Sequence, residues 1–286
     1  MEKVRHYSRG ILLLVFAGAA FIIWYILFYY ESQQDLLIHV FDIGQGDAIF
    51  IEIPGGQQVL IDGGPSGAVL SKLGQTMPFW DRSLDLLVLT HPDKDHITGL
   101  LDVLKRYRVD TILWSGVKHS TAEYEEWLRL IEEEGAKVIL ARANQRLEFG
   151  DSVILDILAP FVDDHGNLIG AMNDTSVVGL LHFENASLLL MGDAAQMTEH
   201  RLMYERPDKL DADVLKVGHH GSNTSSSESF LRMVSPQYAA ISAGRKNRYG
   251  HPHPDVIAAL EAVEAVILRT ATDGDIRLKT NGEEWV

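Results

Sequence analysis

The amino-acid sequence predicts an α/β fold, an αββα sandwich in which two mixed β-sheets pack face to face with helices outside, preceded by one transmembrane helix. Three observations support this prediction. Short apolar runs broken by Gly, Pro and Asp alternate with helical patterns in both halves of the chain, an order that suits two helix-covered sheets. Residues 84–90 form a continuous apolar run, which is typical of a strand buried on both faces. Residues 10–30 carry no charge.

The N-terminal apolar run is the first predicted element. It is long enough to span a bilayer as a helix, which needs about 20 residues. Arg9 precedes the run and Glu31 follows it, so the positive-inside rule predicts a cytoplasmic N-terminus and an extracytoplasmic remainder. A cleaved signal peptide is the alternative, because small residues stand at 17–20, but a strongly apolar stretch follows them. We expect an uncleaved, single-pass anchor in the cell membrane.

This predicts three parts of the chain: the N-terminus and anchor over 1–30, a polar linker over 31–36 and one large domain over 37–286.

Hydrophobic residues make up 46% of the 286 residues, which is enough for a packed core. The chain has no cysteine, which excludes disulfides, thiolate zinc sites and a cysteine nucleophile. Its net charge of −15 disfavours tight nonspecific DNA binding but permits a metal site that meets a phosphate locally.

The domain begins with three predicted strands, over 36–44, 47–53 and 57–64, and a Pro-Gly-Gly turn joins the last two as a hairpin. A buried strand over 84–90 then leads into a helix over 97–108. Further strands are predicted over 111–116, 137–141, 152–160, 175–183, 186–193, 212–218, 238–244, 266–270 and 275–280, and further helices over 121–135, 196–204, 227–234 and 254–263.

Residues 89–100 read LTHPDKDHITGL and place four potential metal ligands within six positions: His91, Asp93, Asp95 and His96. The loop stands between a buried strand and a helix, and catalytic groups in α/β folds collect at the carboxyl ends of strands. Imidazole and carboxylate together suit zinc, manganese or iron. Four such groups in one tight loop cannot all reach one ion, so we expect two ions about 3.5–4 Å apart. A solvated helix N-terminus capped by Asp is the alternative interpretation.

Further potential ligands follow other predicted strands. Asp193 ends one apolar run, and His219 and His220 end another. His251 and His253 come soon after the strand over 238–244. Four such sets at strand ends favour a metal centre over a solvated cap. Four other histidines lie away from these motifs and are expected at the surface: His6, His119, His165 and His200.

The H-x-D-x-D-H spacing resembles that of the metallo-β-lactamase superfamily, whose loop is usually H-x-H-x-D-H, with Asp93 in place of the second histidine. FDIGQGDAIFIEIPGGQQVLIDGG precedes the loop, and LKVGHHGSNTS and GRKNRYGHPHP follow it. With these motifs, the chain resembles the hydrolase domain of the ComEC family of competence proteins over residues 36–280. The resemblance implies an αββα fold and a dinuclear, metal-dependent hydrolase.

The metal ligands that the resemblance implies are His91, Asp93, Asp95, His96, Asp193 and one of His219 and His220. The first two would bind one ion and the next two the other, with Asp193 as the bridge. Which of the paired histidines completes the second site stays open. Asp95 and Asp193 would also act in catalysis. Asp62 would brace the metal loop through hydrogen bonds rather than bind metal itself.

The segment at Asn173 and Asp174 departs from the family, which usually has a Gly-His-Thr motif at this place. We assign both residues a supporting position beside the ligands. Without the histidine the first ion would have more oxygen ligands, so we expect two divalent ions, zinc or manganese. Basic, hydroxyl and imidazole side chains near the motifs would bind the phosphate of the substrate: Lys216, Ser222, Arg248, His251 and His253.

These inferences predict a membrane-anchored, extracytoplasmic, dinuclear metallohydrolase of phosphodiesters, with DNA as the favoured substrate by resemblance. Two ions lower the pKa of water and neutralise phosphate oxygens. With one predicted span and no channel, the chain would serve a separate DNA channel protein or degrade extracellular DNA. Two alternatives stay open: a hydrolase of another phosphoester, such as a choline-phosphate ester on a cell-wall polymer, and a non-catalytic metal-binding module of a DNA-uptake assembly.

Overall fold

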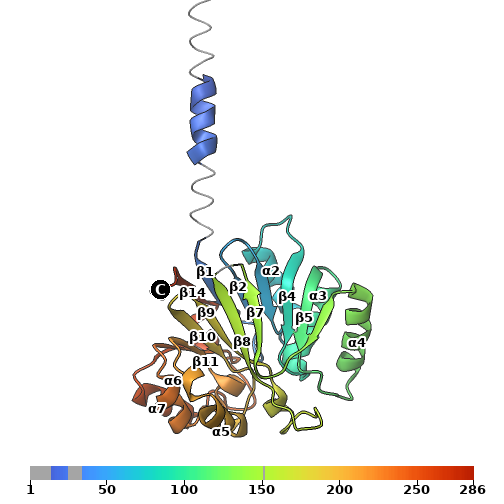
Figure 1. The fold of residues 1–286 in the computed structure, drawn as a ribbon, viewed down its shortest axis with the longest axis vertical. Helices are drawn as coiled ribbons and strands as arrows, with labels where there is room; N and C mark the ends of the chain where they lie inside the picture. The colour runs from blue at the N-terminus through green and yellow to red at the C-terminus, as the bar shows by residue number, and fades with distance from the viewer. Residues whose placement is uncertain (1–13, 25–33, 151) are drawn as a thin grey trace, which may run out of the picture.

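The computed structural model describes residues 14–24, 34–150 and 152–286, and the last two ranges form an αββα sandwich (Figure 1). Two seven-stranded mixed sheets face each other, and helices cover both outer faces. The predicted layer order is therefore confirmed for the domain.

The first sheet has the order β14-β1-β2-β3-β4-β5-β6. Its strands are β1 (Leu36–Val40), β2 (Ile49–Glu52), β3 (Gln58–Ile61), β4 (Ser83–Leu89), β5 (Arg108–Trp114), β6 (Lys137–Leu140) and β14 (Ile276–Thr280). Ile53 and Gln57 close the predicted hairpin turn with a backbone hydrogen bond of 2.8 Å. The last strand of the chain pairs antiparallel with the first, so the two ends of the domain meet in one sheet.

The second sheet has the order β13-β12-β11-β10-β9-β8-β7. Its strands are β7 (Gln145–Phe149), β8 (Val153–Ala159), β9 (Val178–Phe183), β10 (Ala186–Leu190), β11 (Val214–Lys216), β12 (Tyr238–Ile241) and β13 (Val266–Arg269). Read in the order given, the first sheet has three antiparallel pairings followed by three parallel ones, and the second has three parallel pairings followed by three antiparallel ones. In each sheet the parallel strands therefore end at one common edge.

Side chains alternate between the two faces of each sheet, and this alternation builds three apolar layers. Between the sheets, Ile51 and Val88 of the first pack in one cluster with Leu155 and Leu188 of the second. Outside the first sheet lie α2 (Ala68–Thr76), α3 (Lys94–Leu104) and α4 (Ala122–Glu134), anchored by side chains such as the buried Trp127. Outside the second sheet lie α5 (Gln196–Glu205), α6 (Glu228–Val234) and α7 (Pro254–Ala262).

Local signals account for α4, the longest helix of the domain over residues 34–286. The Thr121 hydroxyl accepts a hydrogen bond from the backbone N–H of Tyr124, an ordinary N-cap. Gly135 ends the helix with φ of 69°, a left-handed conformation that favours glycine. Two of the elements absent from the sequence prediction lie in the first half of the domain. They are α2, which is short and contains Gly74, and β7, whose polar residues alternate along an edge strand.

The predicted transmembrane run lies only partly within the described residues. Residues 14–24 are helical and expose large apolar side chains, among them Phe16 and Ile22. Residues 10–13 and 25–30 lie outside the described residues. Within the described parts of the chain, no helix reaches the length and apolar character required to cross a membrane. At the other end of the predicted linker, β1 begins at Leu36 and Asp35 pairs with Lys279 at 2.6 Å.

Candidate metal centre

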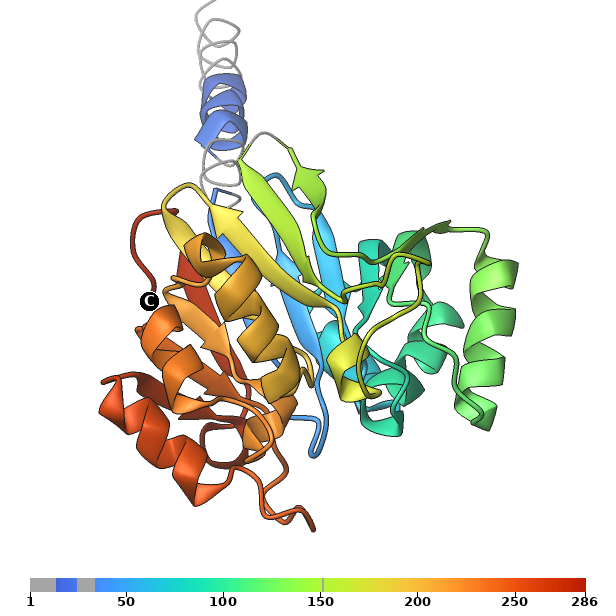
Figure 2. The ribbon, with the colours of Figure 1, turned by 60° about the horizontal axis from the view of Figure 1, so that its bottom comes forward.

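The predicted ligands lie at the carboxyl ends of parallel strands in both sheets. His91 follows β4, Asp193 follows β10, and His219 and His220 follow β11 within η3 (Gly218–Gly221). The carboxyl ends of the parallel strands of both sheets lie on one side of the sandwich, where these loops meet (Figure 2). Residues more than 100 positions apart in sequence thereby share one site.

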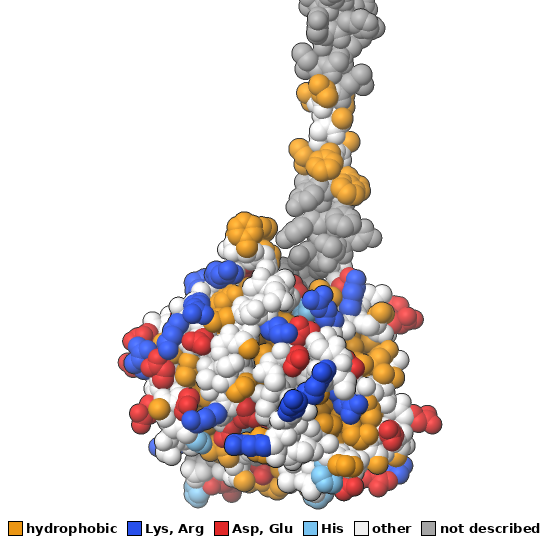
Figure 3. All heavy atoms as spheres, turned by 180° about the vertical axis from the view of Figure 1, so that it is seen from behind, with side chains coloured by type: hydrophobic (Ala, Val, Ile, Leu, Met, Phe, Trp, Pro, Cys, Tyr) orange, Lys and Arg blue, Asp and Glu red, His pale blue; other side chains and the backbone are white. Residues whose placement is uncertain are grey.

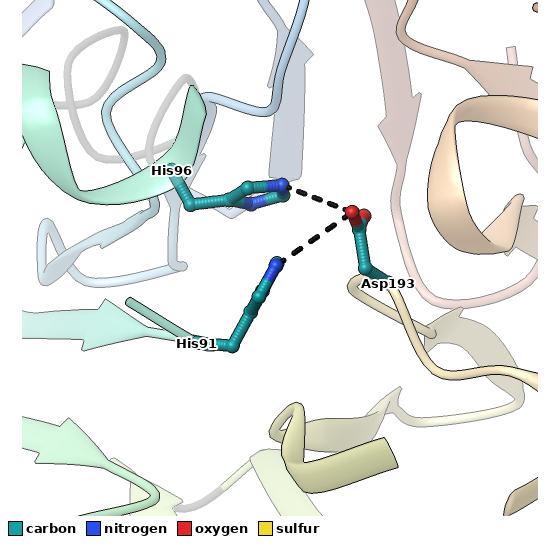
Figure 4. Close-up of side chains that lie close together, drawn as sticks. All are labelled: His91, His96 and Asp193. Atoms are coloured by element: carbon teal, nitrogen blue, oxygen red, sulfur yellow. Dashed lines mark ion pairs between the residues drawn. The ribbon is translucent and has the colours of Figure 1, made fainter. Parts of the chain in front are cut away.

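His91, His96 and Asp193 point toward one another at the centre of this edge (Figure 4). The Nε2 atoms of His91 and His96 lie 3.7 Å and 3.3 Å from Asp193 Oδ2. Both imidazoles are completely buried, and the carboxylate is nearly so. On the outer side, Asp93 Oδ2 lies 3.6 Å from His91 Nε2.

A second group shares Asp193 with the first. The Nε2 atom of His220 lies 3.4 Å from Asp95 Oδ2 and 3.4 Å from Asp193 Oδ2. Asp95, His96 and His220 each offer one ligand atom within a mutual distance of 4.8 Å. The carboxylate of Asp193 thus lies between two ligand groups, which is the position that a bridging ligand requires.

The spacing of these atoms fits metal ligands better than direct hydrogen bonds. Ligand atoms at about 2.0–2.2 Å around a tetrahedral ion lie roughly 3.3–3.6 Å from one another, close to the distances above. Four buried ligand atoms of this centre have no hydrogen-bond partner among the described residues: Nε2 of His91, His96 and His220, and Oδ1 of Asp193. A buried polar atom without a partner costs about 1–3 kcal/mol, and a divalent ion would supply the partner that all four require. The residues therefore fit divalent ions.

The other ring nitrogen of each buried imidazole is held by the protein. Asp62 Oδ2 lies 2.7 Å from His96 Nδ1, the Ser242 carbonyl lies 3.0 Å from His220 Nδ1, and the Thr90 hydroxyl lies 3.1 Å from His91 Nδ1. A hydrogen bond at Nδ1 fixes the ring and leaves Nε2 available to a metal.

Asp62 supports the metal loop at two points. Besides His96, its carboxylate accepts hydrogen bonds from the backbone and the hydroxyl of Thr90 at 2.8 Å and 2.6 Å. Two glycines allow α3 to approach this segment closely, since a Cβ on Gly99 would lie 1.9 Å from the carbonyl oxygen of Gly63. Asp62 thus occupies the bracing position that the family resemblance implies.

The structure distinguishes the paired histidines. His220 is 2% exposed and directs Nε2 at both Asp95 and Asp193. His219 is partly exposed, and its Nε2 lies 3.8 Å from Asp193 Oδ2 alone. Both residues have left-handed backbone angles, with φ of 46° and 54°, an arrangement uncommon for non-glycine residues and concentrated at functional sites. His220 is the better placed to complete the second ligand group.

The charges of the site are strongly coupled. Burial alone would raise the pKa of Asp193, but the imidazoles of His220 and His96 hold it well below its usual range. Burial alone would lower the pKa of His96 and of His220, but the Asp193 carboxylate raises both well above the usual imidazole value. Binding of a divalent ion therefore displaces protons, and metal affinity depends on pH.

An open pocket of about 410 Å³ gives access to the centre. It is lined by Gln45, Asp93, Asp95, Asp193, His219, His220, Tyr249 and His251. His251, a predicted substrate-binding residue, is therefore at the pocket, and its ring stacks on Tyr249 with centroids 5.8 Å apart. Arg248, another predicted substrate-binding residue, is exposed at the rim, with its guanidinium over the Tyr249 ring.

Three predicted substrate-binding residues lie elsewhere. Lys216 is 1% exposed and pairs with Asp47 at 2.7 Å, because the last residue of β11 points into the protein. Ser222 is also buried, and its hydroxyl lies 3.0 Å from that of Thr224. His253 caps α7 by accepting a hydrogen bond from the backbone of Asp255. Burial therefore contradicts the substrate contacts assigned to Lys216 and Ser222, and the contact assigned to His253 stays a prediction.

Asn173 and Asp174, which were both predicted to support the ligands, differ in their contacts. Asn173 Nδ2 lies 3.3 Å from His219 Nδ1, beside the centre. Asp174 faces away and binds Thr198 through its carboxylate, which fixes the start of α5. The supporting position assigned to Asp174 is thus corrected.

Sequence reasoning missed several residues of the site. His119, expected at the surface, lies with Nε2 3.8 Å from Asp93 Oδ1. Its only signal was a position just after a strand that neighbours β4. Asp47 is buried behind His220, with Oδ1 3.4 Å from Nδ1 of that ring. Gln45 and Tyr249 carried no signal apart from their place within motif segments.

Comparison with known proteins gives a consistent family. A model of the metallo-β-lactamase superfamily matches residues 41–245. ComE operon protein 3 of Bacillus subtilis (strain 168) is 32% identical, over 93% of this chain and 36% of its own length. Recombination protein 2 of Haemophilus influenzae is 32% identical, over 95% of this chain and 31% of its own length. The chain thus spans about a third of the length of these curated relatives.

Solved structures share the fold at low sequence identity. CmlA, a diiron β-hydroxylase from Streptomyces venezuelae, is similar with a TM-score of 0.56 and 16% identity, over 86% of this chain and 54% of its own. Zn²⁺-bound PqqB from Methylobacterium extorquens has a TM-score of 0.51 and 14% identity, over 82% of this chain and 87% of its own. These likenesses concern the fold alone.

Proposed function

Because the chain belongs to the metallo-β-lactamase superfamily, we propose that it is a dinuclear metal-dependent hydrolase of phosphodiesters, with DNA as the favoured substrate. The observation that carries the proposal is the carboxylate of Asp193, which lies between two ligand groups whose imidazole Nε2 atoms have no hydrogen-bond partner in the described chain. The ligands of one ion would be His91, Asp93 and Asp193, and those of the other Asp95, His96, His220 and Asp193.

Two divalent ions, zinc or manganese, would supply Lewis acidity that favours deprotonation of water and neutralises phosphate oxygens. The residues of the chain hold the ions and bind the phosphate. Asp95 and Asp193 hold negative charge at the centre and orient the groups around it. Burial lowers the pKa of His251, so its ring is neutral at neutral pH and available to hydrogen-bond a phosphate oxygen at the pocket.

A polynucleotide substrate suits the rim of the pocket. Arg245, Lys246 and Arg248 are exposed on one loop beside it, in a chain whose net charge is −15. Guanidinium and ammonium groups bind phosphates, while the exposed Tyr249 ring offers a surface on which a base can stack. Names of relatives that refer to competence and recombination also favour a nucleic acid.

We further propose that residues 10–30 anchor the chain in the cell membrane, with the domain outside. The uncharged run and the basic residues before it support this placement. In that setting the domain acts beside a separate DNA channel protein or on extracellular DNA.

The full-length chain in detergent tests the enzymatic proposal. We expect cleavage of bis-p-nitrophenyl phosphate and of single-stranded DNA after addition of zinc or manganese, and loss of both after chelation. Asp193→Asn should abolish turnover, while Asp211→Asn, an exposed carboxylate, serves as the matched control. Cleavage of the small ester alone would point to another phosphoester. No turnover with two ions bound would refute the enzymatic proposal and favour a metal-binding module.

A further inference from the structure

Two aromatic side chains project from the domain on the loop between α2 and β4. Phe79 is 79% exposed and Trp80 is 73% exposed, and their rings meet edge to face with centroids 4.7 Å apart. The preceding Pro78 is exposed as well. Adjacent large aromatic side chains on a surface usually mark a contact site.

The topology places this loop where the chain enters the domain. β1 is antiparallel to β2, and β2 to β3, so β1 runs parallel to β3 and hence to β4. The starts of β1 and β4, at Leu36 and Ser83, therefore lie at one edge of the sheet (Figure 1). His91 follows the carboxyl end of β4, so the metal centre lies at the opposite edge.

Basic side chains lie at the same end of the sheet as the aromatic pair, because β5 is parallel to β4. Arg82, Arg106 and Arg108 are all exposed, and the backbone N–H of Arg108 donates to the Arg82 carbonyl at 2.8 Å. Arg108 also pairs with Asp110 at 2.9 Å. Figure 3 shows the apolar projection at the upper end of the domain with Lys and Arg side chains close to it.

We propose that Phe79 and Trp80 insert into the interfacial layer of a lipid bilayer, with anionic headgroups at the three arginines. The proposal rests on the membrane anchor proposed above, because the anchor's chain enters at this edge. Tryptophan favours the boundary between headgroups and acyl chains, and arginine is attracted to anionic lipid there. This second contact would orient the domain, with its metal centre directed away from the membrane.

The absence of cysteine allows a direct test by single-site labelling. Full-length Phe79→Cys, labelled with an environment-sensitive fluorophore, is reconstituted into vesicles of phosphatidylcholine and phosphatidylglycerol. Lys118→Cys is the matched control, because it is exposed and follows the carboxyl end of β5, at the opposite edge. Flotation with the vesicles reports the anchor, and turnover of bis-p-nitrophenyl phosphate reports the fold.

We expect a blue shift and strong quenching by doxyl-labelled lipid at position 79, with neither at position 118. Flotation without quenching at position 79, or with equal quenching at both positions, would overturn the orienting contact and leave the anchor standing. A shift that grows with the protein-to-lipid ratio and resists doxyl lipid would mean that a second copy covers the aromatic pair, which also overturns it. Failure to float would overturn anchor and contact together.

Discussion

Each buried imidazole of the metal centre is held through Nδ1 and presents Nε2 to the interior of the site. This arrangement separates two tasks at the level of single atoms, since one nitrogen sets the orientation and the other meets the metal. The neighbouring His219 is different: it bonds Thr224 through Nδ1 and lies beside Asn173, where the family resemblance places a histidine. The two adjacent histidines should therefore respond differently to substitution.

His220→Ala should remove a ligand of the second ion. We expect loss of about one equivalent of bound metal and a fall in turnover beyond the roughly 10–100-fold that loss of a supporting residue costs. His219→Ala should stay within that range and keep both ions. Elemental analysis with turnover of a small phosphodiester checks both variants, and equal metal loss in the two would contradict the distinction.

Tyr249→Ala should weaken binding of single-stranded DNA while turnover of bis-p-nitrophenyl phosphate stays close to that of the unaltered chain. Stacking of a base on an aromatic ring contributes about 1–3 kcal/mol, and a small ester gains none of it. Fluorescence anisotropy with a labelled oligonucleotide measures the effect. Tyr204→Ala, which removes another highly exposed tyrosine, is the control. An equal loss on the small ester would mean that Tyr249 shapes the centre itself.

The site residues that could be predicted from the sequence lie close together in the chain, whereas those that were missed make contacts with residues far away in the sequence. His91, Asp93, Asp95 and His96 share one loop, so their local spacing identifies them. Asp47 meets Lys216 at a separation of 169 residues, and only the packing of two sheets creates that contact. Lys216 looked like a phosphate ligand for the same reason, because the sequence does not reveal its partner.

At the scale of elements, the ion pair of Asp47 and Lys216 ties the loop between β1 and β2 to the end of β11. Both side chains are 1% exposed, and the ammonium group also donates to the Val217 carbonyl at 3.1 Å. The pair thus joins the two sheets directly behind the metal centre. Its removal should affect stability before it affects chemistry.

Asp47→Asn should destabilise the domain by roughly 3–5 kcal/mol, because Lys216 would be left as a buried charge without its counterion. Chemical denaturation at neutral pH measures the loss. Replacing both residues, Asp47→Leu with Lys216→Met, should recover much of it. A destabilisation below about 1 kcal/mol, the usual limit for an exposed ion pair, would contradict the structural role.

The ion pair of Asp47 and Lys216 should also make the free energy of unfolding depend on pH in the acidic range. Burial alone would raise the pKa of Asp47, but Lys216 lowers it well below its usual range. A depressed pKa contributes stability that is complete above the unfolded-state value of about 3.9 and is lost as pH falls through the folded-state value. Asp47→Asn should therefore flatten the stability profile of the chain at acidic pH.

Elements with strong local patterns could be predicted from sequence, as β4 and α4 were. The pairing of β14 with β1 could not, because no local pattern links strands from the two ends of the chain. The helix α2 escaped prediction because it is a short segment with a glycine inside it. The edge strand β7 also escaped prediction because its polar alternation resembles a loop, whereas the other edge strands, β6, β13 and β14, were predicted.

For the molecule as a whole, metal should stabilise the folded state. A divalent ion would supply the partner that the unpartnered ligand atoms require in the folded state. A ligand that binds only the folded state raises the free energy of unfolding by about 4 kcal/mol at a thousandfold excess over its Kd. Chelation should lower the melting temperature measured by calorimetry, and zinc or manganese should restore it. The variant with both Asp95→Asn and Asp193→Asn should show a melting temperature that no longer responds to metal.

The whole fold was predictable where layers alternate regularly, and the edge that carries the site was predictable from the placement of ligands after strands. The orientation of the domain was not, because the aromatic loop carries no periodic pattern and its position depends on the relation of β1 to β4.

The strand β14 also changes how the two halves of the molecule depend on each other. It comes from the C-terminal half of the chain but completes the sheet built by the N-terminal half. If the chain were cut between β6 and β7, the second fragment would still carry a strand that the first lacks, together with Asp193 and His220. The two pieces would then associate through the pairing of β14 with β1 on one side and through metal ligands that both pieces supply on the other. Metal-dependent complementation of the two fragments would therefore report assembly of the domain.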